Sequence, residues 1–230
     1  MSLRLGVDLD GTLADLSSAY HACEQRMFGS TSADAVEPPA EAEAEPRDET
    51  DVADDRLKRA RQRSLRQEHV WRTIKQTPDF WLGLQPIEDG IIARLYDTAV
   101  RGGWEVFFIT QRPATAGLTV QMQSQRWLIE HGFPTPSVVT LSGSRGKAAS
   151  ALELDYLIDD TPKNCVDVIS DSRCRPLLVL RSPDPSAEES ARRLSIGVVR
   201  TVSEALTRVA AKPAPADTLM TRLTRRLGWP

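Results

Sequence analysis

Short apolar runs alternate with segments of helical periodicity along most of the second half of the chain. The apolar runs occupy residues 104–109, 138–141, 156–158, 177–180 and 196–199, and an earlier run from Leu3 to Val7 ends at Asp8. The later runs are continuous, which is typical of strands buried on both faces of a parallel sheet. Helical spacing separates them at 89–101, 115–131, 146–152, 166–170, 186–194 and 202–211. The pattern therefore predicts an α/β fold with a doubly wound parallel sheet.

The segment that follows the first predicted strand departs from this pattern. We expect residues 1–15 and 86–211 to form the α/β core, and residues 16–85 to form a small helical cap inserted after the first strand. Helical spacing in the cap covers 16–28 and 56–74, and residues 30–55 between them are rich in Ala, Glu, Asp and Pro. Such a composition cannot bury enough apolar surface to offset its ordering entropy, which predicts a disordered insert.

The chain ends with residues 212–230, which read as a linker followed by a short amphipathic helix. We expect this helix to dock on the core or on a second subunit of a homodimer. A helix of this length would bind a membrane only weakly, so no membrane partner is expected.

Composition places the chain among ordinary globular proteins. Of its 230 residues, 40% are hydrophobic and 27% are charged, and no apolar run approaches the roughly 18 residues of a transmembrane helix. The three cysteines, Cys23, Cys165 and Cys174, are odd in number and lack metal-site spacing, which predicts reduced thiols. The first ten residues lack the apolar stretch of a signal peptide, so we expect a cytoplasmic protein.

The net charge of −3 is unevenly distributed. Residues 34–55 contain ten acidic residues and one basic residue, a local charge of −9, which leaves +6 on the rest of the chain. A slightly basic body suits an anionic substrate. The run from Arg56 to Arg66 has six basic residues and no acid, but no interleaved aromatic residue. We expect it to be a solvated helix face or to be neutralised by the acidic tract, so nucleic acid is not an expected partner.

Polar residues directly follow several of the predicted strands. Ligands of parallel sheets bind at the carboxyl ends of the strands, so these residues are expected to converge. An all-oxygen set of carboxylates without Cys or His selects a hard cation, and Mg²⁺ is the leading choice. The alternative without a catalytic role is that Asp8 and Asp10 are turn residues and that Asp159 and Asp160 cap a helix. The converging set comprises Asp8, Asp10, Thr110, Gln111, Arg112, Lys147, Asp159 and Asp160.

These residues resemble the four motifs of the haloacid dehalogenase-like phosphatase superfamily, in the expected order. The motifs are Asp8-Leu9-Asp10-Gly11-Thr12-Leu13, Ile109-Thr110, Lys147 and Ile158-Asp159-Asp160. Dehalogenases of this superfamily lack the second aspartate of the first motif, so Asp10 favours phosphate chemistry. A narrower likeness to the 5'(3')-deoxyribonucleotidase family rests on Leu13-Ala14-Asp15, Phe80-Trp81 and Arg126-Trp127-Leu128-Ile129-Glu130.

The resemblance implies a Mg²⁺-dependent phosphomonoesterase. Asp8 would be the nucleophile, Asp10 the general acid and base, Thr110 a hydrogen-bond donor to a phosphoryl oxygen, and Lys147 the cation that offsets the growing negative charge. The metal would be held by Asp8, the backbone carbonyl of Asp10 and Asp160, with Asp159 bound through water or paired to Lys147.

The substrate expected from the resemblance is a small phosphate ester, a nucleotide in the first instance. Gln111 and Arg112 could contact its phosphate, or Arg112 could pair with an acid at the rim of the site. Leu16, Trp71, Phe80 and Trp81 could line a pocket for a base or sugar, or could pack in the core of the cap. The alternatives are another phosphate ester, namely a sugar phosphate or a nucleic-acid 3'-phosphate, and a non-catalytic interaction protein with the same fold.

Overall fold

The computed structural model describes residues 2–29 and 49–211, and it has a six-stranded, fully parallel sheet at its centre. The strand order is β3-β2-β1-β4-β5-β6, so β1 lies in the middle and the chain winds outward from it in both directions. The predicted doubly wound α/β fold is confirmed. The strands are β1 (Arg4–Asp8), β2 (Glu105–Thr110), β3 (Ser137–Thr140), β4 (Tyr156–Asp159), β5 (Arg175–Val179) and β6 (Gly197–Val199).

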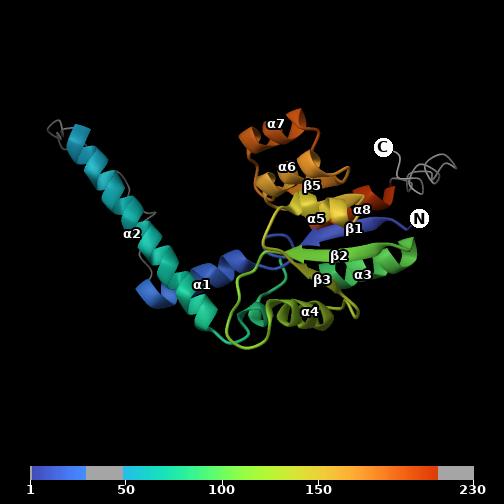
Figure 1. Cartoon of the computed structure of the whole chain (residues 1–230), viewed down its shortest axis with the longest axis horizontal. Helices are drawn as coiled ribbons and strands as arrows, with labels where there is room; N and C mark the ends of the chain where they lie inside the picture. The colour runs from blue at the N-terminus through green and yellow to red at the C-terminus, as the bar shows by residue number, and fades with distance from the viewer. Residues whose placement is uncertain (1, 30–48, 212–230) are drawn as a thin grey trace.

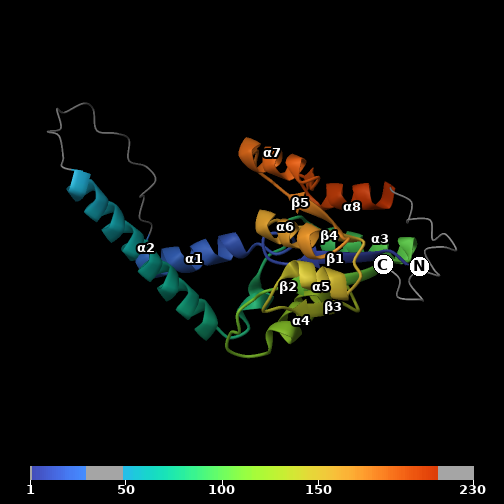
Figure 2. The same ribbon diagram turned by 45° about the horizontal axis from the view of Figure 1, so that its top comes forward.

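Helices cover both faces of this sheet (Figure 2). Apolar residues of α3 (Ile91–Gly102), α4 (Val120–Glu130) and α8 (Val202–Ala211) pack with one face. Those of α5 (Arg145–Ala151), α6 (Pro162–Asp171) and α7 (Pro185–Arg193) pack with the other. Because the central strands are buried from both sides, they carry continuous apolar runs, as the sequence indicated.

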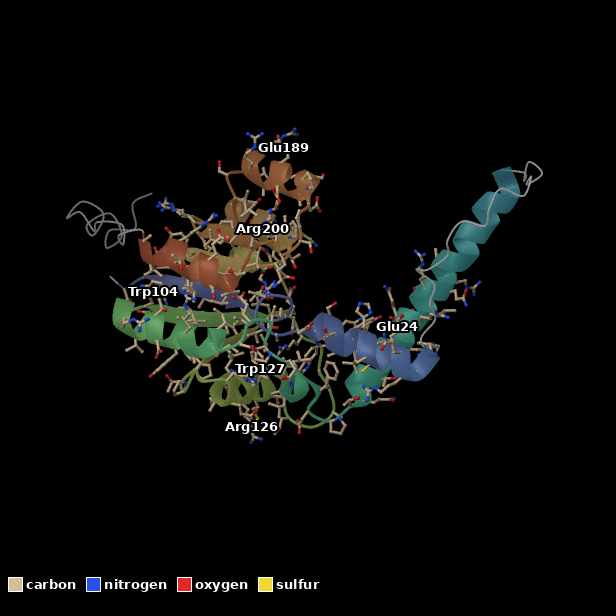
Figure 3. The ribbon with its side chains drawn as sticks, turned by 180° about the vertical axis from the view of Figure 1, so that it is seen from behind. Glu24, Trp104, Arg126, Trp127, Glu189 and Arg200 are labelled. Atoms are coloured by element: carbon tan, nitrogen blue, oxygen red, sulfur yellow. The ribbon has the colours of Figure 1, made fainter. Side chains whose placement is uncertain are left out.

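Two long helices lie between β1 and β2 in the chain and project from the body of the molecule (Figure 1). They are α1 (Leu16–Phe28) and α2 (Glu49–Gln76), followed by the short 3₁₀ helix η1 (Phe80–Gly83). The two helices pack on each other through Cys23, Val70 and Ile74. Glu24, on α1, lies in this projecting part, away from the sheet (Figure 3).

The chain leaves the core and returns to it at one place. The amide of Asp15 donates to the carbonyl of Gln85 at 2.8 Å, and the amide of Ile87 donates to the carbonyl of Leu13 at 2.9 Å. These bonds hold the outgoing and returning segments side by side, next to the carboxyl end of β1.

Several predictions about the segments outside the core can be compared with this structure. The predicted disordered insert covered residues 30–55, but α2 begins at Glu49, so residues 49–55 are helical. Residues 30–48 and the predicted amphipathic helix in 212–230 lie outside the described residues. The three cysteines are free and buried, as expected. Within 2–29 and 49–211, no helix is long and apolar enough to cross a membrane.

A buried tryptophan ties α4 to the returning segment. Trp127 is fully buried, and its indole nitrogen donates to the carbonyl of Leu84 at 2.7 Å (Figure 3). Trp81 of η1 is equally buried, and its backbone amide donates to Oε1 of Gln123 on α4 at 3.0 Å. The base of the cap is therefore fastened to the helix next to the site described below.

Candidate active site

Two aspartates meet because two neighbouring strands end side by side. Asp8 is the last residue of β1 and Asp159 is the last residue of β4, and the register pairs Val7 with Ile158. In a parallel sheet the carboxyl ends of adjacent strands lie at the same edge, so both side chains emerge there. Asp8 is 4% exposed and Asp159 is fully buried.

The loop after β1 folds back on itself and brings Asp10 and Gly11 to the same edge. The amides of Leu13 and Ala14 both donate to the carbonyl of Leu9, at 2.8 and 2.7 Å. Arg181 lies two residues after the end of β5. Its side chain donates to the carbonyls of Gly11 and Thr12 at 2.6 and 2.8 Å. The turn is thus held by its own backbone and by a side chain from a strand further along the sheet.

The start of α5 places an arginine, and not the predicted lysine, among the carboxylates. Ser144 caps this helix by accepting from the amides of Gly146 and Lys147, and its hydroxyl donates to Asp171 at 3.0 Å. Arg145 is 4% exposed and forms an ion pair with Asp8 and a second one with Asp159 at 3.3 Å.

Lys147 does not take part in this cluster. Lys147 is exposed, whereas Arg145 is buried. Residues two positions apart on an α-helix differ by about 200° in direction and so face opposite sides. The expectation that Asp159 pairs with Lys147 is corrected here, since the cation beside Asp159 is Arg145.

The two adjacent aspartates at the end of β4 have different surroundings. Asp159 accepts from the amide of Thr161 at 2.8 Å and from the side-chain amide of Asn164 at 3.0 and 3.1 Å. Asp160 is less constrained, with only long contacts to the hydroxyls of Thr12 (3.4 Å) and Thr161 (3.5 Å). Asp159 is therefore tied to the start of α6 through Thr161 and Asn164, whereas Asp160 keeps oxygens free for another ligand.

Burial raises the pKa values of Asp8, Asp159 and Asp160, and repulsion between carboxylates adds to this effect for Asp8 and Asp160. Burial is the largest cause for Asp8, whose pKa lies well above its usual value, and the charge of Asp159 adds to it while Arg145 opposes it. Burial also raises the pKa of Asp159, against the influence of Arg145 and of its hydrogen bonds. For Asp160, burial and the charge of Asp159 raise the pKa to about 6.

This cluster fits a divalent cation. Asp8, Asp159 and Asp160 each offer a carboxylate oxygen, and the three oxygens lie within 4.8 Å of one another. Asp10 adds a fourth carboxylate, and Arg112 and Arg145 contribute two positive charges, so the ionised group carries −2. An all-oxygen set with this charge favours Mg²⁺ over softer ions.

A cavity of about 220 Å³ adjoins Asp8, Asp10 and Arg145. The hydroxyl of Thr110 lies 3.5 Å from Asp10, and Nε2 of Gln111 donates to the carbonyl of Gly143 at 2.7 Å. Eight of the predicted site residues line this cavity: Asp8, Asp10, Leu16, Trp71, Trp81, Thr110, Gln111 and Arg112. Four residues that were not predicted line it as well: Pro113, Arg145, Thr161 and Asn164.

The predicted aromatic residues divide between the cavity and the interior of the cap. Trp71 is half-buried, packs against Tyr20 with ring centroids 5.6 Å apart, and also lines the cavity. Phe80 packs edge-on against Trp81 and also packs against the apolar cluster of α1 and α2. Among the described residues, it is not one of those that line the cavity. Arg112 is paired with Asp10, the second of the two contacts considered for it.

Sequence reasoning missed Arg145, Asn164 and Arg181. The signal for Arg145 was its position directly after Ser144, a residue type that favours helix N-caps. A helix that begins at residue 145 directs position 145 and position 147 to opposite sides, so only one of the two cations can reach the carboxylates. The other two residues are placed by tertiary contacts, for which the sequence carries no local pattern.

Comparisons with known proteins found similarity among solved structures alone. No protein-family model matches the chain, and no curated protein matches it. Among solved structures, a haloacid dehalogenase-like family hydrolase from Streptococcus pneumoniae is similar at a TM-score of 0.51 and 15% identity, over 90% of this chain and 98% of that one. This likeness shows that the two chains share a fold.

Two further structures are less similar. A HAD hydrolase of family IA, variant 3, from Entamoeba histolytica has a TM-score of 0.41 at 14% identity, over 89% of this chain and 95% of that one. A haloacid dehalogenase-like family hydrolase from Xanthomonas campestris has a TM-score of 0.44 at 13% identity, over 92% and 99%.

Proposed function

We propose that this protein is a Mg²⁺-dependent phosphomonoesterase that hydrolyses a small phosphate ester through a phosphorylated Asp8. The fold it shares with a haloacid dehalogenase-like hydrolase is compatible with this activity. The proposal itself rests on the chemistry of the side chains at the sheet edge.

The observation that carries the proposal is a buried arginine with a free donor nitrogen beside a buried carboxylate. Arg145 and Asp8 both line the cavity, and Nη1 of Arg145 is buried without a partner among the described residues, whereas its Nε lies 3.3 Å from Asp159. A buried donor without a partner costs about 1–3 kcal/mol, which the oxygens of a bound anion would offset. The guanidinium group matches the planar, bidentate geometry of a phosphoryl group.

The reaction follows from the positions of Asp8 and Asp10. A carboxylate oxygen of Asp8 attacks phosphorus, the bond from phosphorus to the ester oxygen breaks, and that oxygen takes a proton from Asp10. In the second step a water molecule attacks phosphorus, its proton passes to Asp10, and the carboxylate of Asp8 is released with free phosphate. Asp10 is regenerated in its protonated form, so the cycle balances.

Two further residues would stabilise the charge that develops on the phosphoryl oxygens. Thr110 lies on the cavity wall and would donate its hydroxyl to one of them. Arg145 takes the role that sequence reasoning assigned to Lys147, because it is the cation that contacts Asp8.

Asp8, Asp160 and the backbone carbonyl of Asp10 would hold Mg²⁺, with Asp159 beside them. When bound, the cation neutralises negative charge between the nucleophile and the phosphate. The assignment of Asp160 as the direct side-chain ligand is supported by its long contacts, since the oxygens of Asp159 already accept from Thr161 and Asn164.

We favour a 5'-nucleotide or deoxynucleotide as the substrate. Trp71, on the cavity wall, offers an aromatic face on which a base could stack. Leu16 adds apolar surface on the same wall, and Gln111 adds an amide. A sugar phosphate would use the same chemistry at Asp8 without needing the aromatic face.

The test is a substrate panel with the purified full chain. Nucleoside 5'-monophosphates, deoxynucleoside monophosphates, sugar phosphates, a 3'-phosphorylated oligonucleotide and an aryl phosphate are compared by phosphate release with Mg²⁺ and with EDTA. We expect Mg²⁺-dependent hydrolysis with nucleotides preferred, and a fall of at least about tenfold in kcat/KM for nucleotides, but not for a sugar phosphate, in Trp71→Ala. Preference for sugar phosphates would overturn the substrate class, and no hydrolysis of any ester would overturn the activity.

A further inference from the structure

Arg112 grips the carboxylate of Asp10 with two of its three guanidinium nitrogens. Nε lies 3.0 Å from Oδ1 and 2.9 Å from Oδ2 of Asp10, and Nη2 lies 2.7 Å from Oδ1. The arginine side chain is fully buried, whereas that of Asp10 is 19% exposed. Charge-assisted, bidentate contacts of this kind fix the orientation of a carboxylate as well as its position.

The guanidinium group is itself held in place from two sides. Nη1 donates to the hydroxyl of Ser124 on α4 at 3.0 Å, and the group lies over the ring of Trp81 at 4.8 Å from its centroid. Trp81 is in turn fixed, because its indole nitrogen donates to the carbonyl of Pro113 at 3.1 Å. The orientation of Asp10 is therefore set by helix α4 and by the base of the cap.

These contacts leave Arg112 poorly placed to bind substrate. Although Arg112 borders the cavity, each of its three nitrogens already donates to Asp10 or Ser124, and its side chain exposes no surface to solvent. Arg145, in contrast, has a buried donor nitrogen, Nη1, without a partner among the described residues, and it lines the same cavity. The two arginines at this site thus have different tasks.

We propose that Arg112 is a positioning residue that holds the carboxyl group of Asp10 in the orientation from which its protonated form delivers a proton to the leaving oxygen. This inference rests on the proposed phosphatase activity. It predicts that loss of Arg112 harms only those reactions that need proton delivery, because in this role Arg112 contacts Asp10 and not the phosphate.

The dependence on the leaving group tests this directly. An alkyl phosphate needs protonation of its leaving oxygen, whereas 2,4-dinitrophenyl phosphate leaves as a stable phenolate without it. The measured quantity is kcat/KM, which reports on the first step and excludes the later attack by water. In Arg112→Met we expect kcat/KM to fall by about 100-fold or more for the alkyl phosphate, as for a lost general acid, and by less than about fivefold for the dinitrophenyl ester.

Milder variants keep the test informative if Arg112→Met does not fold. Arg112→Lys retains a charge but not the two-nitrogen grip, and Ser124→Ala removes one contact that holds the guanidinium group. Both are expected to show the same selective loss on a smaller scale. Added guanidinium ion is expected to restore alkyl phosphate hydrolysis in part in Arg112→Met.

Three outcomes separate the possibilities. A selective loss for the alkyl phosphate supports the positioning role. An equal fall for both esters, or a raised KM with an unchanged kcat, would overturn it and would mean that Arg112 binds phosphate. If the unmodified protein hydrolyses neither ester with Mg²⁺, the proposed function itself is wrong.

Discussion

Gly11 offers a sharp test of the cation site, because it lies directly against Asp160. Its backbone has φ of +77°, and a Cβ atom added there would lie 2.1 Å from Oδ2 and 2.7 Å from Cγ of Asp160. Ordinary contacts begin near 3.4 Å. In Gly11→Ala the carboxylate of Asp160 must therefore retreat by about 1.3 Å, or the turn must move by a similar amount.

Two separate effects of this substitution can be estimated. The positive φ costs an alanine about 1 kcal/mol of unfolding free energy, whatever surrounds it. The displacement of Asp160 acts on the cation instead, because metal–ligand distances are fixed to within about 0.2 Å. A shift several times larger than this tolerance removes the ligand, and we expect the apparent Mg²⁺ affinity to fall by about 10- to 100-fold or more.

Gly103→Ala is the matched control. Gly103 also has a positive φ, +63°, but an added Cβ there meets nothing within 4 Å. It caps the end of α3, before the amino end of β2, and so lies at the opposite edge of the sheet from the carboxylates. It shares the backbone strain of Gly11→Ala without the collision.

The assay titrates Mg²⁺ against both aryl phosphate turnover and thermal stability. We expect both variants to be destabilised by about 1 kcal/mol without metal, and only Gly11→Ala to need more Mg²⁺ for half-maximal activity. If Gly11→Ala and Gly103→Ala show the same Mg²⁺ dependence as the unmodified protein, Asp160 is not a ligand and the reasoning fails.

Three further predictions concern charge, pH and packing. Arg145→Gln should lower kcat by about 100-fold or more while Lys147→Gln stays within about twofold, as steady-state kinetics would show; the reverse result would return the catalytic role to Lys147. Because folding raises the pKa of Asp160 to about 6, its proton-linked stability is complete below about pH 4 and is lost as the pH rises through 6. Without metal, the unfolding free energy of Asp160→Asn relative to that of the unmodified protein should thus rise between pH 4 and pH 7.5, by up to about 3 kcal/mol in urea unfolding. A difference between the two proteins that stays constant with pH would contradict this cause. Trp127→Phe leaves the carbonyl of Leu84 without its 2.7 Å donor and should cost about 1–3 kcal/mol in the same unfolding assay, whereas an unchanged midpoint would show that water replaces the indole.

The strands and most helices of the core were predictable from the sequence because burial on two faces leaves a strong pattern. Each predicted strand overlaps an observed one, and the apolar run at 156–158 lies within β4, Tyr156–Asp159. The convergence of Asp8 and Asp159 also followed, since strand ends of a parallel sheet share an edge. These features depend on local sequence and on a general rule of topology.

Features set by tertiary contacts were not predictable. The helix expected from residue 115 begins at Val120, because the preceding loop is bound elsewhere: Leu118 donates to Asp79 at 2.7 Å and Ala116 donates to the carbonyl of Lys75 at 2.8 Å. Apolar periodicity cannot reveal hydrogen bonds to a segment some 40 residues away.

The sequence analysis named Lys147 from its place in the motif order, whereas contact with the carboxylates depends on the side to which each cation of this helix faces. Sequence analysis began that helix at residue 146, whereas the structure begins it at Arg145, with Ser144 as its cap. Boundaries read from sequence are uncertain by one or two residues, and a residue two positions further along faces the other way. The motif order did not reveal this facing, and the cation beside Asp8 and Asp159 in the structure is Arg145.

The central claim is that Asp8 accepts a phosphoryl group beside a bound divalent cation, and beryllium trifluoride tests it without knowledge of the substrate. This anion bonds to a carboxylate oxygen in the tetrahedral arrangement of a phosphoryl group. With Mg²⁺ and a 100-fold excess of the anion over its Kd, we expect the Tm of the full chain to rise by about 5 to 10 °C, and neither component alone should do so. Asp8→Asn should show no such rise. The same rise in Asp8→Asn, or none in the unmodified protein, would contradict the claim.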